Sequence, residues 1–228
     1  MPVIVMCSTK GGVGKSTTAL VLAQVYSAAG REVTLIDADP NQPLAKWAKR
    51  FAPTVPQNLH VVGNINEENI IDAIDDATKK HPFVIIDLEG SANEAASYAI
   101  SRADLVLIPT RGKQLDADEV GKVIALIERG SKLFRRKVDY RVVFTMMGTT
   151  AVKSKEYRHI RAGFEEKGIP ILPAAMTERA AFTAMFQIGG TIFDLTAEDV
   201  SKPQSAINDA RQIAEAVVTV LREKKEAA

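Results

Sequence analysis

The feature that most constrains the fold of this chain is a glycine-rich segment near its amino terminus, Ser8–Thr17, with the sequence STKGGVGKST. It follows the apolar run Val3–Cys7 and precedes an amphipathic stretch that begins at Ala19. This order of strand, glycine-rich loop and helix is the context that a phosphate-binding loop requires. Glycines let backbone N–H groups turn toward an oxyanion, and the helix start adds its positive dipole end. We therefore expect Lys15 to contact β- and γ-phosphate oxygens and the Ser16 hydroxyl to bind Mg²⁺.

The loop departs from the general pattern G-x-x-x-x-G-K-[ST] at its first position. Thr9 stands where the first glycine is usual, and a second lysine, Lys10, follows it. The pattern K-G-G-x-G-K-[ST] resembles the deviant phosphate loop of the ParA/MinD family of partitioning and positioning ATPases. The resemblance implies ATP as the nucleotide and a role for Lys10 across a dimer interface, on the partner's nucleotide; the simpler alternative is a glycine-rich turn with two solvated lysines. The loop residues expected to bind the nucleotide are Lys10, Gly11, Gly12, Val13, Gly14, Lys15, Ser16 and Thr17.

Length and composition favour one globular α/β domain over residues 1–228. Hydrophobic residues make up 46% of the chain and charged residues 25%, and no apolar run approaches the roughly 20 residues of a membrane span. A single cysteine, Cys7, excludes an internal disulfide. Together with an amino terminus that is already a core strand, this predicts a cytoplasmic protein.

Apolar β-rich runs alternate with helical patterns along the chain, which predicts a doubly wound, mostly parallel β-sheet flanked by helices. The resemblance to the ParA/MinD family implies the same α/β class, that of a P-loop NTPase with a deviant Walker A loop. The expected strands are Val3–Cys7, Glu32–Asp37, His60–Val62, Phe83–Asp87, Leu105–Pro109, Tyr140–Thr145 and Ile169–Leu172. The expected helices are Lys15–Ala29, Pro43–Arg50, Glu67–Lys80, Glu94–Ser101, Ala117–Leu133, Ser154–Lys167, Arg179–Ile188 and Pro203–Lys224.

Two aspartates close the second expected strand, in the sequence VTLIDADPNQ. Ligands of open α/β sheets bind at the carboxyl ends of the strands, so both carboxylates are expected there. The stretch resembles the D-x-D-P-Q signature of ParA proteins, with Asn41 inserted before the glutamine. By that match Asp39 positions the attacking water and Asp37 supports the metal shell. Taken alone, such a pair could also be a turn or a helix cap.

A Walker B arrangement follows, with four apolar residues that end in Asp87. A buried strand would deliver this carboxylate to the water shell of Mg²⁺. Relatives often continue with D-x-P-P or D-T-x-G, whereas this chain continues Leu88-Glu89-Gly90. Glu89 could cap a helix, repel phosphate or assist water, and Gly90 fits a loop that follows the γ-phosphate.

Later segments carry weaker indications. The run Ala103–Thr110 resembles the family strand that precedes the dimer face, and we interpret Asp116 beyond it as a helix N-cap. Met146, at the end of the sixth strand, and Pro173, after the seventh, are expected near the adenine, although the methionine could simply fill core.

Charge is unevenly distributed along the chain. Between Arg129 and Lys167, eleven Lys or Arg stand against four Asp or Glu, whereas the whole chain has a net charge of only +1. Such asymmetry indicates a polyanionic partner or a solvated helix face. The residues expected to bind DNA phosphates without sequence preference are Lys153, Lys155, Arg158 and Arg161.

The resemblance implies an Mg²⁺-dependent ATPase that forms an ATP-bound homodimer and binds DNA nonspecifically. It also implies a role in plasmid or chromosome partitioning, a ParB-like stimulating partner, and association with the nucleoid in the ATP-bound state. Alternatives are a MinD-like membrane-positioning ATPase, a VirC-type ATPase that recruits a conjugative DNA-transfer complex, a ligase related to dethiobiotin synthetase, and a nucleotide-binding regulator without turnover. The carboxyl-terminal helix carries Ala and Val on its apolar face, so we expect it to pack on the sheet rather than on a membrane.

Overall fold

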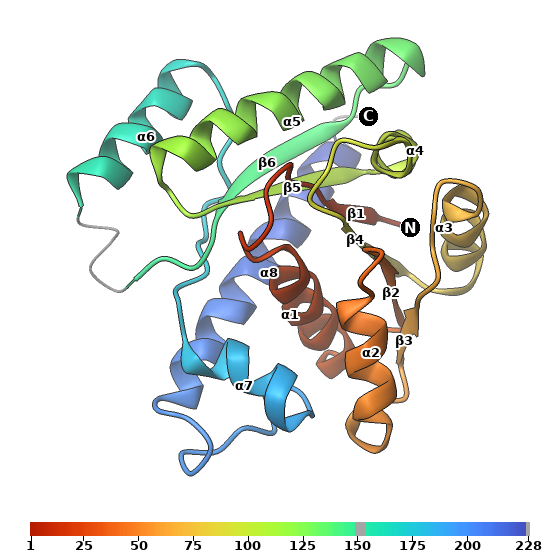
Figure 1. The fold of residues 1–228 in the computed structure, drawn as a ribbon, viewed down its shortest axis with the longest axis vertical. Helices are drawn as coiled ribbons and strands as arrows, with labels where there is room; N and C mark the ends of the chain where they lie inside the picture. Colours follow the sequence, from red (N-terminus) through yellow and green to blue (C-terminus); the bar gives the residue numbers. More distant parts are fainter. Residues whose placement is uncertain (149–153, 227–228) are drawn as a thin grey trace.

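The structure is a computed structural model and describes residues 1–148 and 154–226. Its centre is a six-stranded sheet in the order β3-β2-β4-β1-β5-β6, in which every pair of neighbours is parallel (Figure 1). The strands are β1 Val3–Met6, β2 Val33–Ala38, β3 Leu59–Val62, β4 Phe83–Leu88, β5 Leu105–Thr110 and β6 Asp139–Phe144. The α-helices are α1 Lys15–Ala28, α2 Pro43–Arg50, α3 Ile70–Lys80, α4 Glu94–Arg102, α5 Gln114–Leu133, α6 Lys155–Glu166, α7 Ala180–Ile188 and α8 Pro203–Glu226, and Ala52–Thr54 forms a 3₁₀ turn.

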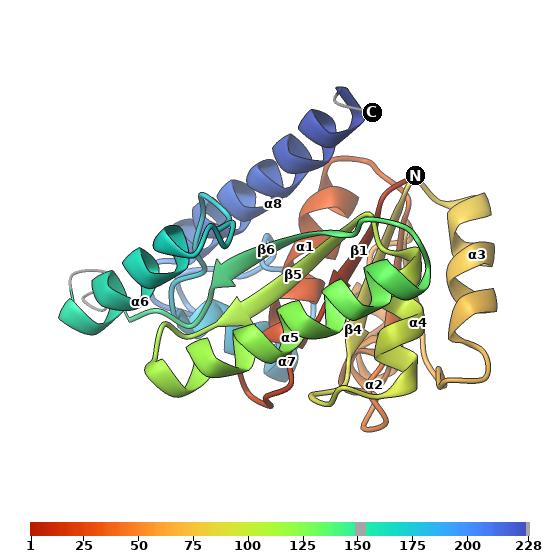
Figure 2. The ribbon, with the colours of Figure 1, turned by 90° about the horizontal axis from the view of Figure 1, so that it is seen from above.

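Helices cover both faces of the sheet, as the alternating pattern predicts. Figure 2 shows α1 and α8 on one side of the strands and α4 and α5 on the other. The central strands are buried on both faces: in β1, Ile4 and Met6 pack with α1, α2, α7 and α8, while Val3 and Val5 pack with α3, α4, α5 and α6. The doubly wound α/β class is therefore confirmed.

The predicted seventh strand, Ile169–Leu172, is wrong as a member of the sheet. Beside β6 it makes one isolated bridge, between Val142 and Ile171. Pro170 has no N–H to donate toward β6 on one side of this bridge, and on the other side the Phe144 carbonyl accepts instead from Met176, so the ladder does not continue.

Two helix starts differ from the prediction by three residues. Helix α3 begins at Ile70 rather than Glu67, because the Asn66 and Asn69 side chains accept hydrogen bonds from the backbone N–H groups of Asn66, Glu68 and Asn69. Helix α5 begins at Gln114, three residues before the expected Ala117. Asp116 consequently lies inside the first turn of α5 rather than at its N-cap.

The carboxyl-terminal helix α8 packs inside the molecule, as expected from its small apolar residues. Ala206, Ala210, Ala214 and Val217 are buried, and the Tyr26 hydroxyl of α1 donates to the Ala214 carbonyl at 3.2 Å. Within residues 1–148 and 154–226, no helix has the length and apolar content needed to cross a membrane.

Candidate nucleotide site

The phosphate loop lies at the centre of the sheet's carboxyl edge, because it follows β1, which is flanked by β4 and β5. Gly12 and Gly14 have φ angles of 70° and 88°, which a residue with a Cβ adopts only with strain. Gly14 is the residue from which α1 starts. The Thr145 hydroxyl donates to the Val13 carbonyl at 2.6 Å, which ties the loop to the end of β6. The loop is thus held in its curved form by its connection to α1 and by the hydrogen bond from Thr145.

Lys15 is only 7% exposed, and its ammonium donates to the Lys10 carbonyl at 3.2 Å. Lys15 is the first residue of α1, and its ammonium points back into the phosphate loop. This is the placement expected for a lysine that meets the terminal phosphates.

The loop after β4 packs directly on the phosphate loop. A Cβ on Gly90 would lie 3.2 Å from the Gly11 nitrogen and 3.4 Å from the Lys15 ammonium. The Glu89 carboxylate accepts hydrogen bonds from the Ser91 hydroxyl at 2.9 Å and the Asn93 amide at 3.2 Å. Asn93 in turn caps α4. In this structure Glu89 orders the loop that carries Gly90.

Asp87 is completely buried, and neither carboxylate oxygen has a hydrogen-bond partner among the described residues. Burial raises the pKa of Asp87 to about 7, although the nearby Ser16 hydroxyl and Lys15 ammonium lower it. An isolated buried carboxylate is costly unless it meets a cation. The donor set of Asp87 and Ser16, both oxygen ligands, therefore fits Mg²⁺.

Asp37 lies opposite Asp87 in the sheet register but has a different environment. One oxygen accepts the backbone N–H groups of Leu44 and Ala45, each at 2.8 Å, and the other accepts the Asp39 N–H at 3.3 Å. Burial raises the pKa of Asp37, and these three N–H groups oppose the shift. Asp37 thus caps α2 from the end of β2, and its predicted part in the metal shell stays a prediction.

Asp39 follows at the same edge and is partly exposed. Its Oδ1 atom accepts the Asn41 N–H at 2.8 Å, and its carbonyl accepts the Gln42 N–H. Asn41, the residue inserted into the signature, therefore closes a turn around Asp39. Oδ2 makes no hydrogen bond or ion pair in the parts of the chain that the structure describes, so this oxygen is available to bind water.

Thr9, which replaces the usual first glycine, and Lys10, the additional lysine after it, both contact α5. The Lys10 ammonium lies 2.5 Å from Asp116 Oδ1, and the Thr9 hydroxyl bonds to Glu119. Asp116 is 2% exposed and also accepts from Arg111, at 2.8 Å and 3.2 Å. Burial alone would raise the pKa of Asp116, but Arg111 and Lys10 outweigh it and hold the pKa at about 2.

The interpretation of Asp116 as an N-cap is therefore wrong. Lys113 occupies that position and makes no side-chain cap, while the Asp116 carboxylate is a buried counter-ion. Sequence reasoning also missed Arg111, which follows β5 at the carboxyl edge. Its position, a charged residue directly after an apolar strand, is the sequence signal that could have identified it as a site residue.

The two residues expected near the adenine lie on adjoining segments. Met146 has a φ of 51° and is 40% exposed. Its side chain lies beside the phosphate loop, since its Cγ is 3.6 Å from the position that a Cβ on Gly14 would occupy. Residues 172–178 run beside the end of β6, because Met176 donates to the Phe144 carbonyl and Glu178 to that of Met147. The exposed Pro173 lies near the start of this segment. Their contact with a base stays a prediction.

The predicted DNA-binding residues lie mainly on α6. Lys155 and Arg158 are exposed there, whereas Arg161 is held by Glu165 at 2.9 Å and by the Tyr157 hydroxyl at 3.1 Å. Lys153 lies outside the described residues. Arg135–Lys137 follow the far end of α5, whose 20 residues span about 30 Å, so they are remote from the start of α6, where Glu156 contacts Gln114.

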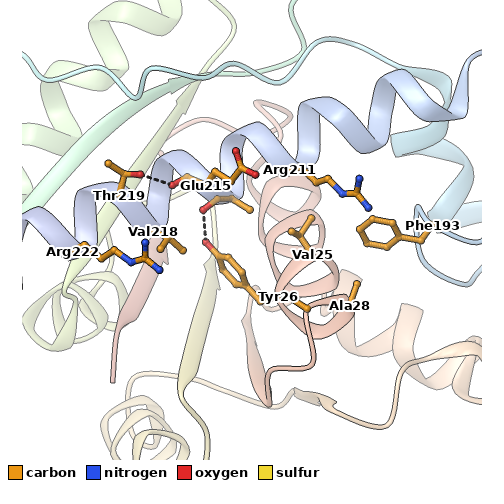
Figure 3. A pocket seen from close by; sticks show the side chains of 11 residues that line it. Val25, Tyr26, Ala28, Phe193, Arg211, Glu215, Val218, Thr219 and Arg222 are labelled. Atoms are coloured by element: carbon orange, nitrogen blue, oxygen red, sulfur yellow. Dashed lines mark hydrogen bonds between the residues drawn. The ribbon is translucent and has the colours of Figure 1, made fainter.

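A cavity of about 650 Å³ lies away from the nucleotide site. It lies between α1 and α8, and the side chains that line it include the apolar Val25 and Val218 and the basic Arg211 and Arg222 (Figure 3). The Arg211 guanidinium lies 5.7 Å from the centre of the Phe193 ring. None of the predicted site residues lines this cavity.

Comparison with known proteins agrees with this geometry. The family model described as VirC1 protein matches residues 1–225. A protein named ParA from Rhizobium radiobacter is 40% identical over 223 residues, which are 98% of this chain and 99% of the relative.

Solved structures show the same fold. MinD of Aquifex aeolicus superposes with a TM-score of 0.70 at 20% identity, covering 93% of this chain and 97% of that one. A variant of McdA from Cyanothece in complex with ATP gives 0.69 at 18% identity, covering 93% and 97%. The chain belongs to the VirC1 family, within the ParA/MinD type of P-loop ATPases.

Proposed function

We propose that this protein is an Mg²⁺-dependent ATPase whose site is completed in an ATP-bound dimer that binds DNA nonspecifically and acts in plasmid or chromosome partitioning. The observation that carries the proposal is the position of Lys10. Its ammonium is held by Asp116 on α5 rather than within its own phosphate loop, where Lys15 already lies. A second loop lysine that is held outside its own loop would be available to contact a partner's nucleotide.

The chemistry of one protomer follows from the carboxyl edge of the sheet. Backbone N–H groups of residues 11–16 and the Lys15 ammonium would bind the phosphates. Ser16 and Asp87 would hold Mg²⁺, which would offset the negative charge on the phosphate oxygens during transfer. Asp39 would orient the attacking water through its available Oδ2 atom. Gly90, in contact with the loop, would bring the backbone after β4 close to the terminal phosphate.

Dimerisation would then require Lys10 to leave Asp116. A buried carboxylate that loses its partner is destabilised by several kcal/mol. Here Arg111 keeps two hydrogen bonds to Asp116, so the carboxylate stays paired when Lys10 swings away. The Asp116–Arg111 pair therefore lowers the free energy needed to release Lys10 toward a partner.

Mixing two inactive variants tests whether Lys10 acts on the partner's nucleotide. Lys10→Ala and Asp39→Ala should each hydrolyse ATP poorly alone. In a mixed dimer, the site on the Lys10→Ala protomer keeps its own Asp39 and receives Lys10 from the other chain. We expect the mixture to regain turnover, measured as phosphate release. No recovery, with both variants shown to bind ATP, would mean that Lys10 acts within its own chain.

The DNA-binding step rests on Lys155 and Arg158 on α6 and on the basic balance of residues 129–167. We expect hydrolysis to be slow alone and to be stimulated by a ParB-like DNA-binding partner, and the ATP-bound form to lie on the nucleoid in the cytoplasm. A role in recruiting a conjugative DNA-transfer complex is the second candidate, because the matching family model is VirC1. A partner that loads the dimer onto a conjugative transfer origin rather than a centromere would favour that candidate.

A further inference from the structure

A second group of ligand-type side chains lies at the amino edge of the sheet, opposite the phosphate loop. Glu32 precedes β2, His60 is the second residue of β3, and His81 precedes β4. One potential ligand atom from each lies within 4.8 Å of the other two. These strands are neighbours in the order β3-β2-β4, and the group contains two of the chain's three histidines. Three separate segments of the sequence therefore converge on one point.

One ring nitrogen of His81 is held by a hydrogen bond to Thr34. Its Nδ1 atom lies 2.6 Å from the hydroxyl of Thr34, a residue of β2 that is 2% exposed. An imidazole whose one nitrogen is fixed by such a bond presents the other as a ligand, which is the common arrangement around protein-bound metals. The other two residues of the group also contact each other, with His60 Nε2 at 2.7 Å from Glu32 Oε2.

We propose that Glu32, His60 and His81 bind one divalent transition-metal ion of the zinc class. Two imidazoles and a carboxylate favour Zn²⁺, Co²⁺, Ni²⁺ or Cu²⁺ over the Mg²⁺ that suits the oxygen ligands of the nucleotide site. With three protein ligands, water completes the coordination. The site joins β2, β3 and the connection from α3 to β4.

Binding requires the His60 and Glu32 side chains to rotate. The His60 and His81 rings are stacked, with centroids 4.2 Å apart and planes 9° from parallel, so their lone pairs are not convergent. The His60 and Glu32 side chains are 42% and 53% exposed and can rotate toward the metal. His81, fixed by Thr34, stays in place and sets the position of the ion.

Metal titration of the untagged full chain, after treatment with a chelator, tests this site. Co²⁺ binding is followed by its ligand-field absorption and Zn²⁺ binding by calorimetry. We expect one ion per chain and at least tenfold weaker binding in His60→Ala and His81→Ala. Thr34→Val should weaken binding about 10- to 100-fold, because the bond that orients His81 is lost. His159→Ala, which removes the exposed histidine of α6, is the matched control and should bind as the wild type does.

The proposal is overturned if the wild type binds no stoichiometric ion, or if binding is as tight in the His60 and His81 variants. Loss of binding in His159→Ala would also contradict it. Retained affinity for Mg²⁺-ATP shows that each variant is folded, and the glutamine variant at the same position, His60→Gln or His81→Gln, replaces an alanine variant that is not. Because ATP affinity is measured separately, failure of the metal site leaves the proposed ATPase function unaffected.

Discussion

At the scale of single residues, two buried aspartates in the same layer of the sheet show how environment separates their roles. Asp37 and Asp87 are register partners on β2 and β4. Asp37 accepts three backbone N–H groups and holds α2 in place, whereas Asp87 has no hydrogen-bond partner in the described regions. A buried carboxylate without a partner destabilises the fold and is retained where a cation binds.

The first prediction concerns Asp87→Asn in the nucleotide-free protein. The folded pKa of about 7 lies above the ordinary 3.8, so the stability that the protonated form provides is lost as pH rises from about 4 through 7. Above pH 7 the charge costs up to about 4 kcal/mol. The variant should therefore have the higher melting temperature at pH 8, by a margin that shrinks toward pH 4, and should lose Mg²⁺-dependent ATP hydrolysis.

Asp37→Asn is the matched control for that prediction. Its amide nitrogen cannot accept the N–H groups that the carboxylate accepts, so this variant should melt at a lower temperature than the wild type at pH 8. An Asp87→Asn protein that also melts lower at pH 8 would show that Asp87 has a stabilising partner.

At the scale of elements, the site is assembled by segments that press on the phosphate loop. The turn after β4 contacts it through Gly90, the end of β6 through Thr145, and the first turns of α5 through Asp116 and Glu119. These segments belong to neighbouring strands and the helices that follow them, so the parallel sheet itself brings them together.

The second prediction follows from the contact at Gly90. A Cβ there would lie 3.2 Å from the Gly11 nitrogen and 3.3 Å from the Lys10 carbonyl carbon, so backbone atoms must shift to admit it. Gly90→Ala should weaken ATP binding at least tenfold, measured with a fluorescent ATP analogue, with little change in the melting temperature.

Gly121→Ala is its control, since a Cβ at this exposed position of α5 meets nothing within 4 Å. It should leave ATP binding unchanged and stabilise the fold by up to about 1 kcal/mol. Equal ATP affinity in Gly90→Ala and Gly121→Ala would contradict the contact between the two loops.

The sequence predicted most elements and the phosphate loop because glycine spacing, apolar strands and strand-end aspartates are local signals. The start of α5 was mispredicted because its N-cap, Lys113, makes no side-chain cap, which left Asp116 as the only capping residue in view. The pairing of Asp116 with Lys10 joins residues 106 positions apart, and no local pattern encodes it. Likewise, the convergence of Glu32, His60 and His81 depends on strand order.

At the scale of the whole molecule, the basic residues are divided between places that are far apart. Lys155 and Arg158 are exposed on α6, on the face of the sheet opposite α2. Arg136, at the other end of α5, instead pairs with Asp104 at 3.0 Å and supports the fold. A DNA surface on this protein is therefore expected on α6 rather than over the entire basic segment.

The third prediction is that Lys155→Ala with Arg158→Ala weakens ATP-dependent DNA retention equally for unrelated sequences. Each lost phosphate contact should lower the slope of log affinity against log salt by about one, measured by filter binding or fluorescence anisotropy. Lys46→Ala with Lys49→Ala removes the same charge from α2 and should have no such effect. Equal losses in the two double variants would point to net charge rather than to a surface on α6.

The central claim is that the site of one chain is completed by Lys10 of another. The most direct measurement is the mass in solution, by light scattering, of the wild type and of Lys10→Ala with Mg²⁺ and ATP, each in an Asp39→Ala background that slows hydrolysis. We predict that the chain with Lys10 doubles from 24.7 kDa when ATP is added and that Lys10→Ala stays at the monomer mass although it binds ATP. Doubling of both proteins, or of neither, would contradict the account.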